Sequence, residues 1–214
     1  MRLVLFDVDG TLVDSQAHIV ASMEAAFAGE GLPPPTREET LSIVGLSLPQ
    51  AMATLAPEGP VHALVEGYKR AYVDLRESHG EASPLYPGIR ALLDELHSEP
   101  ETLLGVATGK SRRGLDLLFE IHDLAGYFVT RQDADGHPSK PHPSMAFAAL
   151  AEAGLETGVM IGDTTFDMEM GRAAGMATVA VTWGYHDAAR LTPLADRVVS
   201  DMGALRAAID EVSG

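Results

Sequence analysis

Residues 2–11 read RLVLFDVDGT, and this stretch decides the fold. Its first part, residues 2–6, is a short apolar run in which polar and apolar positions do not alternate. Such a run is typical of a strand buried on both faces, as in a parallel sheet. Similar runs occur at 102–107, 158–162 and 177–181. We therefore expect these segments to form the strands of one buried sheet.

Helical patterns separate these apolar runs. Pro143 is compatible with the first turn of one such helix, because the nitrogen of proline has no hydrogen to leave unpaired there. The alternation of short strands and helices predicts βαβ units, and therefore an α/β fold with a Rossmann-like parallel sheet. The predicted helices occupy residues 88–97, 112–121, 143–153, 164–174 and 201–211.

Residues 15–83 interrupt this alternation, because they contain helical patterns and no buried-strand run. Two segments, 36–39 and 47–50, fit a capping box, with Ser or Thr at the cap and Glu or Gln three positions later. The simplest organisation is an α/β core domain formed by 1–14 and 84–214. The remaining residues would then form a helical insert.

The composition restricts the partners and the compartment. Fifteen Lys and Arg residues against thirty-one Asp and Glu residues give a formal net charge of −16. This balance argues against nucleic acid or an anionic membrane as a partner, and any phosphate site must be locally positive. The chain has no cysteine and no apolar stretch near the ~20 residues of a membrane span, so we expect a cytoplasmic protein without disulfides.

Two aspartates follow the first predicted strand. Asp7 and Asp9 are two positions apart, so both carboxylates point the same way if the strand continues that far. Gly10 then allows a tight turn whose backbone N–H groups can face an anion. Because ligands of open α/β sheets gather at the carboxyl ends of strands, this pair is a candidate metal and phosphate site. A simple turn or a calcium loop is compatible with the same residues.

A second pair of acids opens a later helix. Residues 161–167 read IGDTTFD and follow a predicted strand. Asp163 and Asp167 are four positions apart, so both can lie near the helix start on one side. Capping of the helix by Asp163 or Thr164 is compatible with this role. Acids from two strand ends make an oxygen-rich site that suits Mg²⁺ with retained waters.

Two further segments supply groups that suit phosphate. Thr108 and Gly109 follow the run at 102–107 and offer a hydroxyl and backbone N–H groups to a phosphate oxygen. Lys140 lies between prolines that stiffen its loop, and it is one of three lysines in the chain. A lysine held in this way is a stronger candidate for a site than an ordinary surface lysine.

Together these segments resemble the haloacid dehalogenase superfamily, and within it the phosphatase branch. The motifs occur in the order DVDGT at 7–11, Thr108 at a strand end, Lys140 in SKPHP, and GDTTFD at 162–167. The resemblance covers the whole chain, because the insert 15–83 lies where the family has a helical cap domain. Within this branch the chain is most similar to phosphoglycolate phosphatases, on KPHP, on GDTTFDMEMGRAAG and on WGY at 183–185.

The resemblance implies a role for each candidate residue. Asp7 would attack phosphorus and form an aspartyl-phosphate, while Asp9 would protonate the leaving alcohol and then activate water. Lys140 would restrain Asp7 and contact the transferred phosphoryl group. Substrate contacts would come from Thr108, Gly109, Lys140 and Gly10. The metal, Mg²⁺, would be bound by Asp7, the carbonyl of Asp9, Asp163 and Asp167.

Other activities of the same superfamily fit less well. The dehalogenase branch lacks the second acid, which Asp9 supplies here. A phosphonate-cleaving relative needs a lysine in the cap, where this chain has only Lys69, in a predicted helix. A sugar-phosphate mutase of the beta-phosphoglucomutase kind would carry an arginine in the cap loop, which reads VGLSL at 44–48. The mutase and a non-catalytic phosphate-binding module are the two alternatives.

The substrate is the least determined feature. The cap loop at 45–48 is small and mostly apolar, which favours a compact phosphate monoester, and the resemblance suggests phosphoglycolate. Arg37 could reach a carboxylate, and His142 could approach the site beside Lys140, although a solvated position is compatible with both. The sequence does not distinguish a monomer from a homodimer.

Overall fold

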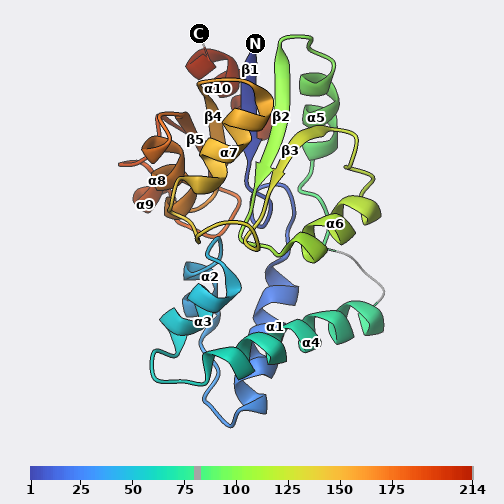
Figure 1. Ribbon diagram of the computed structural model, residues 1–214, viewed down its shortest axis with the longest axis vertical. Helices are drawn as coiled ribbons and strands as arrows, with labels where there is room; N and C mark the ends of the chain where they lie inside the picture. Colours follow the sequence, from blue (N-terminus) through green and yellow to red (C-terminus); the bar gives the residue numbers. More distant parts are fainter. Residues whose placement is uncertain (80–82, 214) are drawn as a thin grey trace.

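Our computed structural model of the protein describes residues 1–79 and 83–213 (Figure 1). Residues 80–82 of the predicted insert lie outside this part. The strands of the sheet are β1 (Arg2–Phe6), β2 (Thr102–Ala107), β3 (Phe128–Gln132), β4 (Gly158–Gly162), β5 (Ala177–Val181) and β6 (Arg197–Val199).

The sheet has the strand order β3-β2-β1-β4-β5-β6, and all neighbouring strands are parallel. β1 is central, and its last residue Phe6 lies opposite Val106 of β2 and Ile161 of β4. The strand order reverses between β1 and β4, where open α/β sheets form their binding crevice. The prediction of an α/β fold with a Rossmann-like parallel sheet is confirmed.

The sequence does not predict β3 and β6, the two edge strands. β3 mixes buried and exposed positions, and Val129, its second residue, is 56% exposed. β6 has only three residues, and Arg197 at its start is exposed. A continuous apolar run arises only where a strand is covered on both faces, so neither edge strand has the pattern that identifies the others.

Helices cover both faces of the sheet. One face carries α5 (Ile89–His97), α6 (Arg112–Ile121) and α10 (Met202–Ser213). The other face carries α7 (Ser144–Ala153) and α8 (Thr165–Ala173), with the short α9 (Ala188–Leu191) beside α8. None of the described helices has the length and apolar composition of a membrane span.

The two-sided cover explains the apolar run of β1. Val4 and Phe6 belong to the apolar cluster on the α5 face, whereas Leu3 and Leu5 belong to the cluster on the α7 face. All four side chains are completely buried. The strand therefore needs apolar residues at successive positions, as the sequence shows.

The segment between β1 and α5 forms a separate group of helices and has no strand within the described residues. These helices pack around an apolar cluster of their own, which includes Met23, Met52 and Leu64. Gly67 and Ala26 lie against each other where two of these helices pack, and a Cβ at Gly67 would be in ordinary van der Waals contact with Ala26. In Figure 1 this helical segment lies at the carboxyl end of the sheet, and it contains α1 (Gln16–Gly29), α2 (Arg37–Ser42), α3 (Leu48–Leu55) and α4 (Val61–His79).

The two predicted capping boxes have different outcomes. At α2 the box forms, because Thr36 Oγ1 accepts from the Glu39 N–H at 3.2 Å and the Glu39 carboxylate accepts from the Thr36 N–H at 2.8 Å. At α3 the prediction is wrong, because the Ser47 side chain makes no capping bond. The Ser47 N–H donates instead to Ser139 Oγ at 2.8 Å, which ties the helical segment to the loop before Lys140.

The chain leaves and re-enters the α/β part at adjacent points. The Asp14 N–H donates to the Pro84 carbonyl at 2.9 Å, and the Tyr86 N–H donates to the Leu12 carbonyl at 3.0 Å. The two connections therefore run side by side, close to the predicted boundaries at residues 14 and 84. This pairing places the helical segment directly over the end of β1.

Candidate active site

The turn after β1 carries the first two candidate aspartates. The Asp7 N–H donates to the Ile161 carbonyl of β4 at 2.8 Å, which extends the strand pairing by one residue. Asp7 is 1% exposed and Asp9 is 9% exposed, so neither carboxylate is a solvated surface group. The Gly10 N–H donates to the Val13 carbonyl at 2.9 Å. This N–H is therefore used within the turn and does not face an anion, which corrects the expectation for Gly10.

Lys140 joins the end of β1 to the start of α8. Its Nζ lies 2.6 Å from Asp7 Oδ1 and 2.6 Å from Asp167 Oδ1, and its side chain is completely buried. The second oxygen of Asp167 accepts hydrogen bonds from the N–H and the hydroxyl of Thr164, at 3.1 and 2.6 Å. Thr164 is therefore the residue that caps α8. The lysine is fixed between two carboxylates that are far apart in the sequence.

Asp163 is completely buried beside this ion pair. Its Oδ1 accepts from the Thr11 hydroxyl at 3.0 Å, and its Oδ2 accepts from the Tyr185 N–H at 2.8 Å. A Cβ at Gly10 or at Gly184 would lie only 2.2 Å from Asp163 Oδ2. Glycine is therefore required at both positions, and the role of Gly10 is to make room for this carboxylate.

The three buried aspartates can hold a metal ion. Carboxylate oxygens of Asp7, Asp163 and Asp167 lie within 4.8 Å of one another. Asp7 Oδ2 is buried and has no hydrogen-bond partner among the described residues, although buried polar atoms are normally paired. Lys140 compensates one of the three carboxylates and leaves excess negative charge. A buried, unpaired oxygen in an acidic cluster suits a hard divalent cation.

The cluster changes the protonation of its members. Burial raises the pKa of Asp7 to about 7 against the opposing charge of Lys140, and the charge of Asp167 raises it further. Burial also raises the pKa of Asp163, with a further contribution from Asp7. Burial lowers the pKa of Lys140, but the charges of Asp167 and Asp7 more than offset this, so its pKa lies above the ordinary value. The lysine is therefore charged, and its single positive charge is too small to balance the three buried carboxylates.

Asp9 lies beside this cluster and is bound by residues that the sequence analysis did not identify. Its Oδ1 accepts a hydrogen bond from the Ser15 hydroxyl and lies 2.9 Å from Lys110 Nζ. Burial lowers the pKa of Lys110, but the charge of Asp9 more than offsets this, so the pKa lies above the ordinary value. The available signal for Lys110 was its position at a strand end in a chain with three lysines.

Thr108 and Gly109 lie after β2, and both line the same cavity as Asp7 and Asp9. Thr108 Oγ1 accepts from the Lys110 N–H at 3.2 Å, which leaves the proton of its hydroxyl available to an anion. A Cβ at Gly109 would lie 2.5 Å from the carbonyl oxygen of Leu46. This glycine therefore lets the loop between α2 and α3 approach the end of β2.

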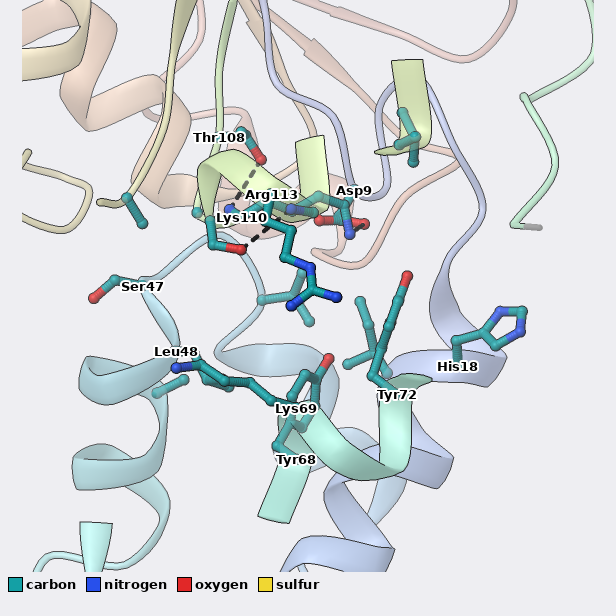
Figure 2. Close-up of a pocket in the computed structure, with 18 of the residues that line it drawn as sticks. Asp9, His18, Ser47, Leu48, Tyr68, Lys69, Tyr72, Thr108, Lys110 and Arg113 are labelled. Atoms are coloured by element: carbon teal, nitrogen blue, oxygen red, sulfur yellow. Dashed lines mark hydrogen bonds and ion pairs between the residues drawn. The ribbon is translucent and has the colours of Figure 1, made fainter. Parts of the chain in front are cut away.

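A cavity of about 580 Å³ lies between the sheet and the helical segment (Figure 2). Tyr68 and Tyr72 of α4 extend from below toward Asp9 and Lys110, and Arg113 of α6 extends into the cavity (Figure 2). Pockets for small molecules have volumes of roughly 300–1,000 Å³. The cavity therefore has an ordinary volume for a small-molecule site, and it can also admit substrates larger than the compact monoester expected from the sequence. The apolar wall includes Ile19, Met23, Ile43, Val65 and Leu117.

Three other residues do not belong to the aspartate cluster, and the sequence analysis considered two of them. His142 is exposed, and its Nδ1 accepts from the first N–H of α7 at 3.2 Å. Arg37 is exposed at the start of α2 and does not line the cavity. His186 is buried, with Nδ1 accepting from the Thr165 N–H and Nε2 donating to the Ser42 carbonyl, both at 3.1 Å. Its neutral ring therefore links α8 to α2, and burial lowers its pKa.

The chain is similar to proteins of one family over almost its whole length. Residues 4–181 match the model of the haloacid dehalogenase-like hydrolases. A probable phosphatase, IndB, from Dickeya dadantii is 35% identical over 209 residues, which cover 93% of this chain and 89% of that protein. A phosphoglycolate phosphatase from Agrobacterium fabrum is 32% identical over 219 residues, which cover 98% and 92%. A hydrolase structure from Pseudomonas syringae has a TM-score of 0.86 at 25% identity and covers 99% of both chains.

Proposed function

The chain belongs to the haloacid dehalogenase-like hydrolase family and is one of its phosphatases, and we propose that it hydrolyses a small phosphate monoester with Mg²⁺ through an aspartyl-phosphate. The observation that carries this proposal is the buried cluster around Asp7. One oxygen of this carboxylate is fixed by Lys140, and the other has no partner among the described residues. A carboxylate with this environment is suited to covalent catalysis.

Asp7 is the nucleophile in this proposal. Its carboxylate attacks phosphorus, which forms an acyl-phosphate and breaks the bond between phosphorus and the oxygen of the leaving alcohol. Water then attacks the phosphorus, releases inorganic phosphate and regenerates the carboxylate. Lys140 holds the plane of the carboxylate during both steps, because its ammonium is fixed between Asp7 and Asp167.

Asp9 would move the protons of both steps. It would donate a proton to the leaving alcohol in the first step and accept one from the attacking water in the second. Asp9 lines the cavity and is bound on one oxygen by Ser15 and Lys110. This separation of roles follows from the two environments, because Asp7 lies within the acidic cluster and Asp9 lies beside it.

Mg²⁺ would be held by Asp7, Asp163 and the carbonyl of Asp9. Asp167, whose oxygens are bound by Lys140 and by Thr164, would bind the metal directly or support the residues that do. When bound, the cation supplies positive charge that offsets the repulsion between the carboxylate and an anionic ester. This charge also accounts for a phosphate site in a protein with a net charge of −16.

The transferred phosphoryl group would be held by Thr108, Gly109 and Lys140. The Thr108 hydroxyl can donate, because its oxygen already accepts from the backbone. The Gly109 N–H has no hydrogen-bond acceptor within residues 1–79 and 83–213, so it is available to a phosphate oxygen. Gly10 does not belong to this set, because its N–H closes the turn after β1.

Residues 15–83 would form a cap domain on a core domain made of 1–14 and 84–214. Support for this division comes from the separate apolar cluster of α1, α3 and α4 and from the paired connections at Asp14 and Pro84. In this proposal the cap closes over the cavity once substrate is bound. Closure excludes water that would otherwise compete for the phosphoryl group.

Phosphoglycolate is the substrate we propose, with support from the name of the Agrobacterium fabrum relative. Arg113 extends into the cavity (Figure 2), and it has no ion-pair partner within the described part of the chain. It could therefore receive the carboxylate of the glycolate group, a role for which the sequence suggested Arg37. The volume of the cavity also admits larger leaving groups, so the test must include them.

Release of inorganic phosphate, with and without Mg²⁺, tests the proposal on p-nitrophenyl phosphate, phosphoglycolate and several sugar phosphates. We expect release that requires both Mg²⁺ and Asp7, with the highest kcat/KM on phosphoglycolate. A preference for a sugar phosphate of about tenfold would remove phosphoglycolate and leave the reaction class intact. An isomeric sugar phosphate as product would indicate a mutase. No release from any ester would indicate a non-catalytic phosphate-binding module.

A further inference from the structure

Lys110 is the second lysine of the site and is largely enclosed, and the proposed reaction does not assign it to the phosphoryl group. Its side chain is 13% exposed, and its Nζ lies 2.9 Å from Asp9 Oδ1. Burial of an ammonium group is unfavourable unless the charge is paired. The position of Lys110 is therefore determined by a specific contact with Asp9.

Lys110 and Ser15 bind the same oxygen of Asp9. Oδ1 accepts from the Ser15 hydroxyl and pairs with the Lys110 ammonium. Oδ2 has no hydrogen bond or ion pair among the described residues, and Asp9 lines the cavity. Two contacts on one oxygen fix the plane of the carboxylate, so Oδ2 is the oxygen that can exchange a proton with substrate.

The same ammonium also contacts the helical segment. Lys110 Nζ lies 5.4 Å from the centroid of the Tyr72 ring on α4, within the ~6 Å of a cation–π contact. The Tyr72 ring stacks on Tyr68, with centroids 6.0 Å apart and planes at 25°. Figure 2 shows both rings reaching from α4 toward Asp9 and Lys110. One charged group therefore connects the acid after β1 to an aromatic wall of the helical segment.

We propose that Lys110 is a positioning residue that aligns Asp9 for proton transfer, and that Tyr72 completes this alignment when the helical segment lies over the cavity. The inference rests on the proposed role of Asp9. Movement of α4 away from the sheet would remove the ring from Lys110 and admit water around the ammonium. Proton transfer would then be efficient only while the substrate is enclosed.

The positioning role predicts a dependence on the leaving group. An alkoxide needs a proton from Asp9 to leave, whereas p-nitrophenolate leaves without one. In single-turnover measurements, Lys110→Met should slow alcohol release from an alkyl phosphate by about 10- to 100-fold, because general acid catalysis contributes that much or more. The same variant should slow p-nitrophenolate release by less than about threefold. Lys110→Arg keeps the charge and should restore most of the lost rate.

Tyr72→Leu tests the contribution of the helical segment. This variant keeps the ion pair and removes the ring, so it should show the same selectivity for alkyl esters with a smaller loss, about three- to tenfold. Arg70→Met is the matched control, because Arg70 is exposed on the same helix and does not line the cavity. Its rates should stay within about twofold of the wild type, as expected of an exposed position away from the site.

A double variant distinguishes positioning of Asp9 from a separate effect. Adding Lys110→Met to Asp9→Asn should cause no further loss on the alkyl ester, because both changes remove one function. A further loss, or equal losses on both esters in Lys110→Met or in Tyr72→Leu, would overturn the inference. If Lys110→Met does not fold in a thermal unfolding assay, Tyr72→Leu and Lys110→Arg provide the same comparison. If the wild type hydrolyses neither ester, the proposed function itself fails.

Discussion

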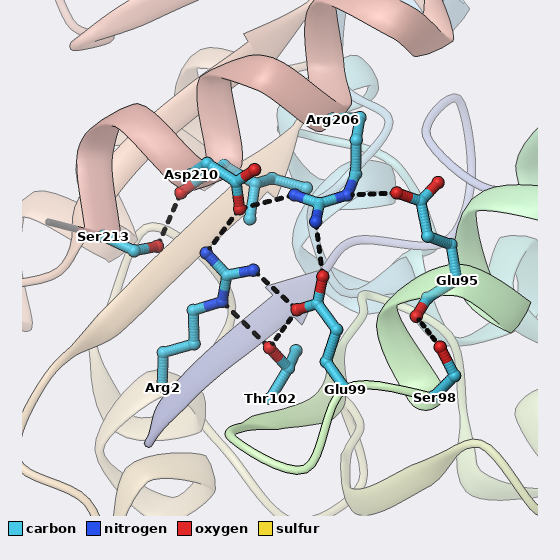
Figure 3. A network of polar contacts seen from close by, with 9 residues as sticks. Arg2, Glu95, Ser98, Glu99, Thr102, Arg206, Asp210 and Ser213 are labelled. Carbon is cyan, nitrogen blue, oxygen red and sulfur yellow. Dashed lines mark hydrogen bonds and ion pairs between the residues drawn. The ribbon is translucent and has the colours of Figure 1, made fainter.

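Two clusters of charged residues lie at opposite ends of the sheet, and they differ in solvent exposure and in the balance of their charges. The inner cluster lies at the carboxyl ends of β1 and β4 and contains Lys140, Asp7, Asp163 and Asp167. The outer network lies at the start of β1, beside α5 and α10, and contains Arg2, Arg206, Glu95, Glu99 and Asp210 (Figure 3). The comparison separates partly exposed charges that pair with one another from buried charges to which we assign a chemical role.

Each arginine of the outer network forms ion pairs with at least two acids. Arg2 reaches Glu99 at 2.8 Å and Asp210 at 2.9 Å, and Arg206 binds both of these acids and Glu95. The side chains of the two arginines are about one-fifth exposed. Water and salt therefore screen these contacts, and each contributes little to the free energy of folding.

The inner cluster is buried and lacks positive charge. Side chains of Lys140, Asp7 and Asp167 are at most 2% exposed, and one oxygen of Asp7 has no partner in the described structure. Burial raises the pKa of both Asp7 and Asp163, so the folded chain opposes their ionisation. These raised pKa values support the proposal that the inner cluster binds a cation and takes part in the reaction.

The largest expected effect is on turnover when Asp7 is changed. Asp7→Asn should lower kcat by at least about 10⁴-fold, because loss of a nucleophile removes the covalent route. Asp210→Asn is the matched control, since it makes the same chemical change in the outer network and should leave kcat unchanged. Steady-state phosphate release at saturating Mg²⁺ measures both. Comparable activity of the two variants would contradict the assignment of Asp7.

Asp9→Asn should reduce turnover almost as strongly and leave metal binding largely intact. The expected loss is about 10²- to 10⁴-fold, the usual contribution of general acid–base catalysis. The proposed metal contact of Asp9 is its carbonyl, which the substitution keeps. Titration calorimetry with Mg²⁺ measures the affinity, and Asp163→Asn should lose it. If Asp9→Asn loses Mg²⁺ binding to the same extent, the Asp9 side chain has a different role.

Lys140→Met should destabilise the metal-free protein by roughly 3 kcal/mol, because removal of one partner leaves buried carboxylates without compensation. Urea unfolding at neutral pH measures this change. Saturating Mg²⁺ should reduce the deficit, since the cation replaces part of the missing charge. A loss below about 1 kcal/mol, the range of exposed pairs, would show that Lys140 contributes no more to the free energy of unfolding than a residue of the outer network.

The stabilisation by Mg²⁺ should depend on pH. The pKa of Asp7 is about 7 in the folded chain, above the ~3.9 of an unfolded aspartate, so the folded protein binds more protons between these values. The contribution of Asp7 to the stability of the metal-free protein therefore falls as pH rises from about 4 to 7. Mg²⁺ competes with this proton and should raise Tm by about 2–4 °C more at pH 8 than at pH 6.

Asp7→Asn provides the control for this pH dependence, because its side chain does not titrate. The Mg²⁺-induced shift in Tm should be smaller in this variant and should vary less between the two pH values. Scanning calorimetry at both pH values, with and without Mg²⁺, measures the difference. A wild-type shift that is larger at pH 6 would contradict the direction of the pKa change.

The smallest expected effect is in the outer network. Arg206→Met should cost about 1 kcal/mol or less in the free energy of unfolding, with no change in kcat. The loss should shrink further near 1 M salt, where screening acts over a few ångströms. Urea unfolding at low and high salt measures it. A salt-independent loss as large as that of Lys140→Met would remove the distinction between the two clusters.

The sequence predicted the strands that are covered on both faces. The apolar runs at 2–6, 102–107, 158–162 and 177–181 coincide with β1, β2, β4 and β5. The sequence analysis did not predict β3 and β6, because edge strands do not need such runs. The resemblance to haloacid dehalogenase phosphatases is confirmed by the family match together with the phosphatase relatives.

The site was predictable where it depends on strand ends. Asp7 and Asp163 meet because parallel strands place their carboxyl ends at one edge of the sheet, and Lys140 reaches them from the loop before α7. The contact between Lys110 and Tyr72 was not predictable, because it depends on how α4 lies over the sheet. No local pattern in the sequence encodes that placement. The use of the Gly10 N–H within its turn likewise depends on the backbone path after β1.

The most direct test of the central claim is to identify the residue that carries the phosphoryl group. Asp9→Asn should accumulate the covalent intermediate on p-nitrophenyl phosphate, because this leaving group needs no proton whereas the attacking water needs a base. The reaction is stopped with acid, and mass spectrometry of peptides locates the modification. We predict an acyl-phosphate on Asp7. A phosphoryl group on any other residue, or phosphate release with no phosphorylated enzyme, would contradict the account.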